Sequence, residues 1–544
     1  MINRTDALWQ IRTTLSVRGF IPDKLDPRRF VGTLVVGHHT IDVVVEVPDL
    51  DFIQLPRVHL QNRHQLPWDV IAHQRRETGI CYGLQGHYSL DPAFPGAAIL
   101  RVLADCVKAL LSSAKGRGAE EAAREYAAYW GGPSVCLISP LRQGTRLTAY
   151  RRNVLGRGPN SLLASSQADL PQGYASLKKQ YTVVELPGPA QPAGEVLVPS
   201  RLSDLFKWLS SLGADAGVER TCIQAMKDSG GIVISASNGL YGVDLHTPAL
   251  LAAIKGPRAN FFSARVKSES EKIEIERFQV SPADLGSVVT RSLPVGSATL
   301  SERNVCLVGC GAIGGHLAKL LAQLGAGHKK SLSLIDPDLL TAGNIGRHAL
   351  GFEYVGQWKS EAVAAELAKF HPQISTKAVV GTVADHLAAL SRCDLVVDAT
   401  GVENVASQLN RFSIERRGVK HPPVLFHVHL FGYGIAAQSF ANLGSGYACY
   451  RCLRPDRSQS WRHDPKLDVR TEDDPVDGGC GDGAFLPYGP YASSAAASLS
   501  AQHIHDWAQG RNRSTLRTLT LDPDRGRQIA PTTPTVHEHC PECQ

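Results

Sequence analysis

Three glycines and an aspartate form the stretch best suited to binding a nucleotide. Gly309, Gly311 and Gly314, spaced as G-x-G-x-x-G, follow the apolar run 305–308 and open a helix-length segment. A side chain at Gly309 would block the tight turn, one at Gly311 would hold a phosphate away, and one at Gly314 would separate helix from strand. A second apolar run ends at Asp336, whose carboxylate suits a ribose hydroxyl. The pattern predicts a nucleotide-binding βαβ unit, with a ligand-free glycine-rich turn as the alternative.

Polar side chains after Asp336 indicate which nucleotide chemistry to expect. They comprise an acid, an amide, two cations and a carboxylate that ends a later apolar strand: Asp338, Asn344, Arg347, Lys359 and Asp398. Cations near a triphosphate and a carboxylate for magnesium serve phosphorus chemistry. Hydride transfer needs none of them. An NAD-dependent oxidoreductase is therefore disfavoured.

These residues resemble the ThiF, MoeB and ubiquitin-activating family of adenylating enzymes. The likeness lies within residues 292–544, with D-x-D at Asp336, N-x-x-R at Asn344, then Lys359, then D-A-T at Asp398. It implies a Rossmann-like domain that binds ATP and Mg²⁺ and forms an acyl-adenylate. Asp336 would hold the ribose and Asp398 the magnesium, while Arg347 and Lys359 would offset phosphate charge. The resemblance also implies a homodimer.

Two C-x-x-C pairs have the composition of a zinc site. They are Cys449 with Cys452, and Cys540 with Cys543 at the end of the sequence. Four thiolates suit tetrahedral Zn²⁺, and the adenylating family often holds zinc in such a split arrangement. Ordinary reduced thiols without a metal are the alternative.

Cys480 is a candidate nucleophile. It has glycine on both sides and no Val, Ile or Leu within three residues, so it does not read as a packed core thiol. Flexible neighbours let an acyl partner approach, and a thiolate attacks a mixed anhydride readily. By resemblance to activating enzymes, Cys480 is the thioester-forming residue; a structural cysteine is the alternative.

The N-terminal region carries a second candidate thiol, Cys81. An amphipathic helix over 1–18, an antiparallel meander over 30–60 and helices over 95–113 and 118–129 surround it in the sequence. This order resembles a ubiquitin-conjugating domain, closest to divergent bacterial versions, and implies that Cys81 is a second thioester carrier. A buried strand thiol is the alternative. The eukaryotic H-P-N tripeptide is absent and His73 stands where its asparagine would lie, so the role of His73 is open.

The expected architecture is a multidomain α/β protein. Residues 1–132 form an α+β conjugating-like domain, 133–291 an α/β connector and 292–544 the Rossmann-like adenylation domain. The connector shows β-type runs and helices over 204–212 and 248–255, but no chemical constellation. His427 and His429 alternate in a β-type run, which places both on one strand face. With no third ligand in view, they do not define a metal site.

Composition excludes several classes. The 57 basic and 51 acidic residues leave a net charge of +6 without a long basic run, so direct nucleic-acid binding is not implied. The start lacks a signal peptide, and no apolar stretch is long enough for a membrane span. We expect a cytoplasmic protein whose cysteines are thiols, ligands or nucleophiles.

The combined prediction is an ATP-dependent transferase. The C-terminal carboxylate of a partner protein would be adenylated. The acyl group would then pass to Cys480, next to Cys81, and finally to an amine, which we expect to be a lysine. The whole arrangement resembles the ubiquitin-transferase-like family of bacterial CBASS anti-phage operons, which implies a cyclic-oligonucleotide synthase as the activated partner. The alternatives are activation of a separate ubiquitin-like or sulfur-carrier protein, and a non-catalytic nucleotide-binding scaffold.

Overall fold

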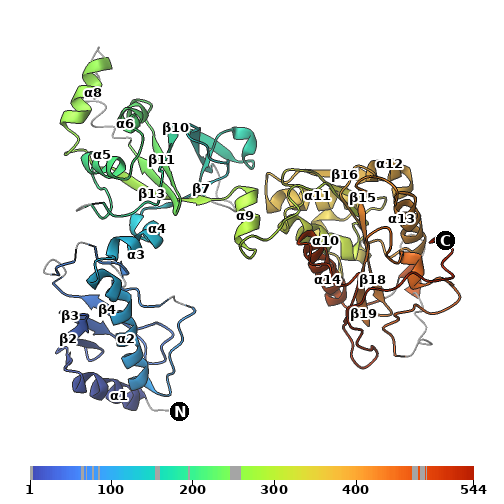
Figure 1. Cartoon of the computed structure of the whole chain (residues 1–544), viewed down its shortest axis with the longest axis horizontal. Coiled ribbons are helices and arrows are strands. Elements are labelled where there is room, and N and C mark those ends of the chain that lie inside the picture. Colours follow the sequence, from blue (N-terminus) through green and yellow to red (C-terminus); the bar gives the residue numbers. More distant parts are fainter. Residues whose placement is uncertain are drawn as a thin grey trace. The chain divides into compact units, whose positions relative to one another are not determined.

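The chain packs as two compact units, Met1–Pro282 and Ala283–Gln544 (Figure 1). The structure, a computed structural model, describes residues 4–62, 66–68, 70–75, 79–83, 86–152, 160–193, 196–245, 259–467, 476–477, 484–485 and 487–543. Helix α9 (Leu285–Arg291) belongs to the second unit, where the Leu285 amide donates to Gln373 Oε1 at 3.0 Å. The three-domain division at residues 132 and 291 stays a prediction.

The first unit begins with a helix and an antiparallel meander, as the sequence predicts. Helix α1 (Arg4–Val17) packs on α2 (Pro95–Ala114) through the buried side chains of Ile11 and Leu15. The four-stranded sheet has the order β1 (Ile21–Pro22), β2 (Arg29–Val36), β3 (His39–Glu46) and β4 (Arg57–Leu60). A short antiparallel pair follows, β5 (Gln74–Arg75) with β6 (Gly79–Ile80). The helix expected over 118–129 is divided into α3 (Gly118–Arg124) and α4 (Tyr126–Trp130).

The rest of the first unit is a closed seven-stranded barrel with helices on its outside. Around the barrel the strands are β10 (Tyr174–Glu185), β11 (Gly231–Ala236), β12 (Gly239–Asp244), β13 (Glu276–Pro282), β7 (Ser134–Leu137), β9 (Ser161–Ala164) and β8 (Arg146–Arg152). The helices are α5 (Leu202–Ser211), α6 (Val218–Lys227) and α8 (Ala259–Ser268). Helix α5 confirms the prediction over 204–212, whereas the helix expected over 248–255 lies outside the described residues. Barrel closure was not foreseen, because strand pairing between distant segments leaves no local sequence signal.

The second unit is a mainly parallel sheet with helices on both faces. Its strands are arranged β16 (Thr376–Val380), β15 (Leu332–Asp336), β14 (Val305–Val308), β17 (Leu395–Asp398), β18 (Val424–Phe431), β19 (Ala436–Asn442) and β22 (Leu516–Thr520). Strand β19 runs antiparallel to both of its neighbours, β18 and β22. Every residue of β14 and β17 is buried, which explains their continuous apolar character. A separate short pair joins β20 (Val476–Asp477) to β21 (Ala484–Phe485).

Two groups of helices cover this sheet (Figure 1). Helices α10 (Ala312–Gln323), α11 (Lys359–Phe370) and α14 (Pro490–Ala508) share one apolar core with the sheet. Helices α12 (Leu387–Leu390) and α13 (Glu403–Glu415) form a second core on the other face. A sheet covered on both sides exposes its functional edge only at the strand ends.

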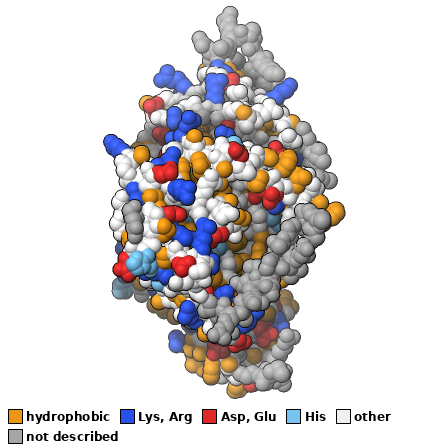
Figure 2. All heavy atoms as spheres, turned by 90° about the vertical axis from the view of Figure 1, so that its right-hand side faces the viewer, with side chains coloured by type: hydrophobic (Ala, Val, Ile, Leu, Met, Phe, Trp, Pro, Cys, Tyr) orange, Lys and Arg blue, Asp and Glu red, His pale blue; other side chains and the backbone are white. Residues whose placement is uncertain are grey.

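The described helices include no membrane span, and one face of the molecule carries charges of both signs. Among the helices of the described ranges, none has the length and apolar character that crossing a bilayer requires. On the face drawn in Figure 2, basic, acidic and apolar side chains are interspersed. This mixture agrees with the small net charge of +6.

Candidate functional site

A cavity of about 700 Å³ opens at the carboxyl ends of the central strands of the second unit. Strands β15 and β16 lie on one side of β14, whereas β17 and β18 lie on its other side. The chain order therefore reverses beside β14. Ligands bind at such a switch point in doubly wound sheets. Of the residues predicted to bind nucleotide, five line this cavity: Gly309, Gly311, Asp336, Asp338 and Lys359.

The surroundings of the glycine turn explain why glycine is needed at these positions, as the sequence predicts. Gly309 has φ +88°, and a Cβ there would lie 2.8 Å from the Thr400 amide nitrogen. A Cβ on Gly314 would collide with the carbonyl oxygen of Gly309. A Cβ on Gly311 would meet no atom within 4 Å, so the space beside it belongs to the cavity. The first turn of α10 therefore faces an open volume into which a phosphate fits.

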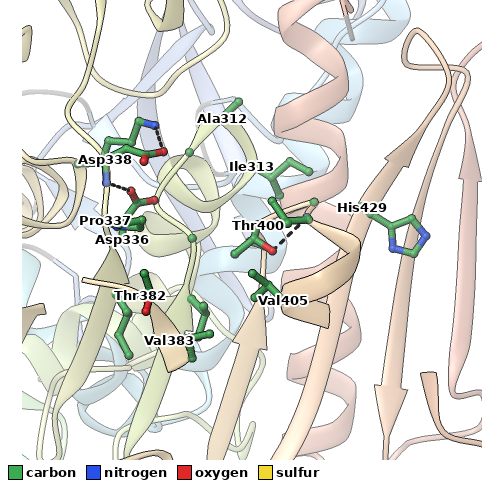
Figure 3. Close-up of a pocket in the computed structure, with 18 of the residues that line it drawn as sticks. Ala312, Ile313, Asp336, Pro337, Asp338, Thr382, Val383, Thr400, Val405 and His429 are labelled. Carbon is green, nitrogen blue, oxygen red and sulfur yellow. Dashed lines mark hydrogen bonds and ion pairs between the residues drawn. The ribbon is translucent and has the colours of Figure 1, made fainter. Parts of the chain in front are cut away.

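Asp336 is fixed at the base of the cavity (Figure 3). Its carboxylate is buried and accepts hydrogen bonds from the amides of Cys310, at 2.7 Å, and Asp338, at 2.9 Å. Burial raises the pKa of Asp336, and these two amides oppose that shift. The carboxylate is thus oriented before any ligand arrives. Asp338 in turn pairs with Lys359 across 2.9 Å.

Asn344 and Arg347 do not line the cavity among the residues described. The Asn344 side chain accepts from the Thr341 amide at 3.0 Å and closes a short turn. Arg347 donates to the Gly343 carbonyl at 3.1 Å and also hydrogen-bonds Tyr488, which does line the cavity. Arg347 thus stands one side chain away from the ligand space. Its role at the phosphates stays a prediction.

Asp398 is already engaged by three donors. It is 3% exposed, accepts from the amide and hydroxyl of Thr400 at 3.1 and 2.7 Å, and lies 2.9 Å from Nδ1 of His427. It lines a smaller pocket next to the cavity instead of the cavity itself. The magnesium role predicted for Asp398 is untested by this geometry.

Sequence reasoning overlooked several residues that form this site. His429 lines both the cavity and the smaller pocket, and Thr382, Val383, Thr400 and Tyr488 line the cavity. In Figure 3 the Asp336 and Thr382 side lies opposite His429, with Thr400 and Val405 between them. The alternation of His427 and His429 was the only available signal, and both imidazoles do line one pocket. Burial lowers the pKa of His429 to about 4.

The four C-x-x-C cysteines converge on one point. Sγ of Cys449 lies 3.8 Å from that of Cys452 and 3.7 Å from that of Cys540, and the Cys452 and Cys543 sulfurs are 3.5 Å apart. All four sulfurs lie within 4.8 Å of one another. Zn–S bonds of about 2.3 Å would set tetrahedral sulfurs ~3.8 Å apart. The group can therefore hold a metal ion, although its identity as zinc stays a prediction.

Cys81 lies in a separate cleft of the first unit. The cleft, of about 510 Å³, is also lined by His73, Tyr82, Asp105 and Glu121. Cys81 follows β6 and is partly exposed, and its amide donates to the His73 carbonyl at 2.6 Å. Nδ1 of His73 donates a hydrogen bond to the Glu125 carboxylate across 3.2 Å, and this bond raises the pKa of His73. Cys480, the other predicted thioester residue, lies outside the described residues.

Comparison with known families gives one match in each of the two units. Residues 291–542 match the ThiF family model and residues 26–133 match the model of prokaryotic E2 family B. The chain is thus an enzyme with E1-like and E2-like features, in which a ThiF adenylation domain follows an E2-like domain on a Rossmann-like, multidomain α/β framework.

Similar proteins exist over nearly the whole length. The chain is 28% identical to the ATP-dependent ubiquitin transferase-like protein Cap2 of Pseudomonas aeruginosa (strain BWHPSA011 / Pa011), over 91% of this chain and 90% of that protein. It is 25% identical to Cap2 of Escherichia coli (strain TW11681), over 94% and 92%. Among solved structures, E. coli MccB with ATP matches at 17% identity, covering 54% of this chain and 84% of that one, with a TM-score of 0.35.

Proposed function

We propose that the chain uses ATP to activate the C-terminal carboxylate of a partner protein and then transfers that protein to an amine. The observation that carries the proposal is the convergence of the glycine turn, Asp336 and Lys359 on one cavity, on the same chain as the thiol cleft of Cys81. Further support comes from the ThiF match and from the Cap2 relatives, which are named as ATP-dependent ubiquitin transferase-like proteins.

The first step is adenylation. A carboxylate oxygen of the partner attacks the α-phosphorus of ATP, and pyrophosphate leaves. Asp336 holds the ribose, the amides after Gly311 cradle the phosphates, and Lys359 offsets charge that grows on the phosphate oxygens. Magnesium, which Asp398 would hold, would supply positive charge that stabilises the leaving pyrophosphate. The chain's own contribution is to hold the attacking carboxylate, the α-phosphorus and the leaving pyrophosphate in one line.

The next steps move the acyl group between thiols. The Cys480 thiolate attacks the acyl carbon and AMP leaves, giving a thioester. The Cys81 thiolate displaces Cys480 in the same way. An amine, which we propose to be a lysine of the target, then attacks the Cys81 thioester and forms an amide while the thiolate leaves. No oxidant or reductant is needed.

The partner that we propose is a cyclic-oligonucleotide synthase of a CBASS anti-phage system, activated by a cytoplasmic homodimer of this chain. Near full-length similarity to the Cap2 relatives supports this choice. Activation of a separate ubiquitin-like or sulfur-carrier protein is the second candidate. It is favoured by 28% identity over 29% of the chain to a Yarrowia lipolytica adenylyltransferase and sulfurtransferase, but the Cys81 domain is not needed for sulfur transfer.

Two cysteine variants test the relay. With ATP and the purified synthase, Cys480→Ala should keep pyrophosphate exchange but form no thioester, whereas Cys81→Ala should accumulate one on Cys480. Cys393→Ala is the matched control. Thioesters are read on non-reducing gels and their partners identified by mass spectrometry. Charging of Cys81 by Cys480→Ala would refute the relay order, and absence of pyrophosphate exchange with any protein tail would refute the function.

A further inference from the structure

Asn410, on α13, is a polar side chain without exposed surface. Its amide oxygen accepts hydrogen bonds from the backbone amide of Tyr450 at 2.8 Å and from the side chain of Asn442 at 3.3 Å. Its amide nitrogen donates to the Glu542 carboxylate and to the Cys449 sulfur. A side-chain amide has two acceptor and two donor positions, so all four are in use. The mechanism given above assigns this residue no task.

The partners of Asn410 come from both halves of the four-cysteine cluster. Cys449 and Tyr450 belong to the first C-x-x-C segment, whereas Glu542 lies between the two cysteines of the second. Groups that hydrogen-bond to metal ligands orient those ligands. Buried polar groups that lose their partners are unfavourable, so the network resists rearrangement. Asn410 therefore holds the end of the described chain and Tyr450 in one fixed relation.

The ring of Tyr450 extends this network to His427. The two ring centroids are 4.3 Å apart, with the planes inclined by 30°, and both side chains are buried. Nδ1 of His427 lies 2.9 Å from Oδ2 of Asp398. Because closely packed side chains have little room to move, a shift of the Tyr450 ring moves the imidazole. The Asp398 carboxylate, bonded to that imidazole, is then displaced as well.

We propose that Asn410 is a positioning residue for adenylation, which connects the four-cysteine cluster through Tyr450 to the His427–Asp398 pair. The packing of the cluster then sets where the Asp398 carboxylate lies. This inference rests on the proposed function, in which Asp398 holds magnesium. An asparagine with only a structural role contributes to stability alone, whereas a positioning asparagine also changes how strongly Mg²⁺ supports nucleotide binding.

The quantity to measure is the Mg²⁺ effect, the factor by which Mg²⁺ strengthens the binding of a non-hydrolysable ATP analogue to the full chain. Calorimetry with and without Mg²⁺ gives this factor without turnover. Asn410→Asp keeps the oxygen that faces Tyr450 but sets a second carboxylate oxygen against Glu542. We expect this variant to reduce the Mg²⁺ effect at least fivefold. Asn512→Asp, in the same unit but outside this network, is the control and should leave the Mg²⁺ effect unchanged.

An exchange of donor and acceptor tests the link to the chain end. In the double variant Asn410→Asp with Glu542→Gln, the new amide donates to the new carboxylate, so at least half of the lost Mg²⁺ effect should return. Cys540→Ser disrupts the cluster from the other side, which elemental analysis of zinc verifies, and should also reduce the Mg²⁺ effect. Combining Cys540→Ser with Asn410→Asp should be no worse than either change alone, because both act through one path.

Tyr450 provides a second test, which does not depend on the folding of the Asn410 variants. Tyr450→Ala removes the ring that packs on His427 and should reduce the Mg²⁺ effect as Asn410→Asp does, whereas Tyr450→Phe keeps the ring and should not. A wild-type Mg²⁺ effect in Asn410→Asp or Tyr450→Ala would overturn the inference, as would a double variant without recovery. If the wild type binds the analogue with Mg²⁺ but releases no pyrophosphate with ATP and any protein tail, only the proposed function fails.

Discussion

Nζ of Lys359 lies 2.9 Å from Oδ2 of Asp338, and the two side chains of this ion pair differ greatly in solvent exposure. The lysine side chain is 12% exposed and the aspartate 63%. Lys359 is also the first residue of α11, where the helix dipole disfavours a cation. A cation kept at an unfavourable helix end, beside an exposed carboxylate and on a cavity wall, is placed to meet an anionic ligand.

Replacing this lysine should therefore impair adenylation. Lys359→Met is expected to slow pyrophosphate exchange about 10²–10³-fold, the usual loss when one well-placed donor to a developing anion is removed. Lys369→Met is the control, because Lys369 lies on the same helix but pairs with surface Glu353 and Glu366. Exchange by Lys359→Met within threefold of wild type would contradict the assignment.

Two glycines of the turn should respond differently to alanine. Gly311→Ala places a methyl group in open space at an ordinary φ of −75°, so the melting temperature should hold while ATP affinity falls at least tenfold. Gly314→Ala drives its methyl into the Gly309 carbonyl and should cost about 1–3 kcal/mol of unfolding free energy. Calorimetry and thermal melting separate the two effects. Normal ATP binding by Gly311→Ala would place the phosphates elsewhere.

The four-cysteine cluster should bind one zinc ion per chain. We expect elemental analysis to find one equivalent in the wild type and less than a tenth of that in Cys540→Ser, because three thiolates remain. Chelation should lower the melting temperature, since the metal ties the chain end near Cys540 to the segment that holds Cys449. Cys393→Ser, outside the cluster, serves as the control. Equal zinc content in both serine variants would disprove the site.

The His73–Glu125 pair should make stability depend on pH. The hydrogen bond that His73 donates to Glu125 raises the pKa of His73 above its ordinary value of about 6.5. The pair therefore stabilises the fold fully below that ordinary value, and the contribution is lost as pH rises through the folded-state pKa. Glu125→Gln should be less stable than the wild type by about 1 kcal/mol near pH 6, and the gap should close toward about pH 9.

Denaturant unfolding at several pH values measures this effect. Glu120→Gln is the matched control, because Glu120 lies on α3 and contacts exposed Arg124 instead of His73. A gap for Glu125→Gln that does not change between these pH values would mean that His73 carries no charge in the pair.

The sequence by itself determined the positions of the glycine turn and of Asp336, both of which line the cavity of the second unit. The turn from Gly309 to Gly314 and the strand that ends at Asp336 are local features, because apolar periodicity and glycine spacing report directly on backbone conformation. The C-x-x-C spacing likewise indicated a metal site before the cysteines were seen together. The helix and the antiparallel meander of the N-terminal region were likewise predicted from local sequence patterns.

Only the tertiary structure decided how distant side chains meet. It joined Asp398 to His427 across neighbouring strands, brought Cys449 to Cys540, placed Glu125 against His73 and closed the middle strands into a barrel. These contacts depend on strand order and on the packing of segments far apart in the chain, for which local propensity carries no information. Asp398 therefore looked like a free carboxylate in the sequence, whereas in the folded chain three hydrogen bonds already hold it.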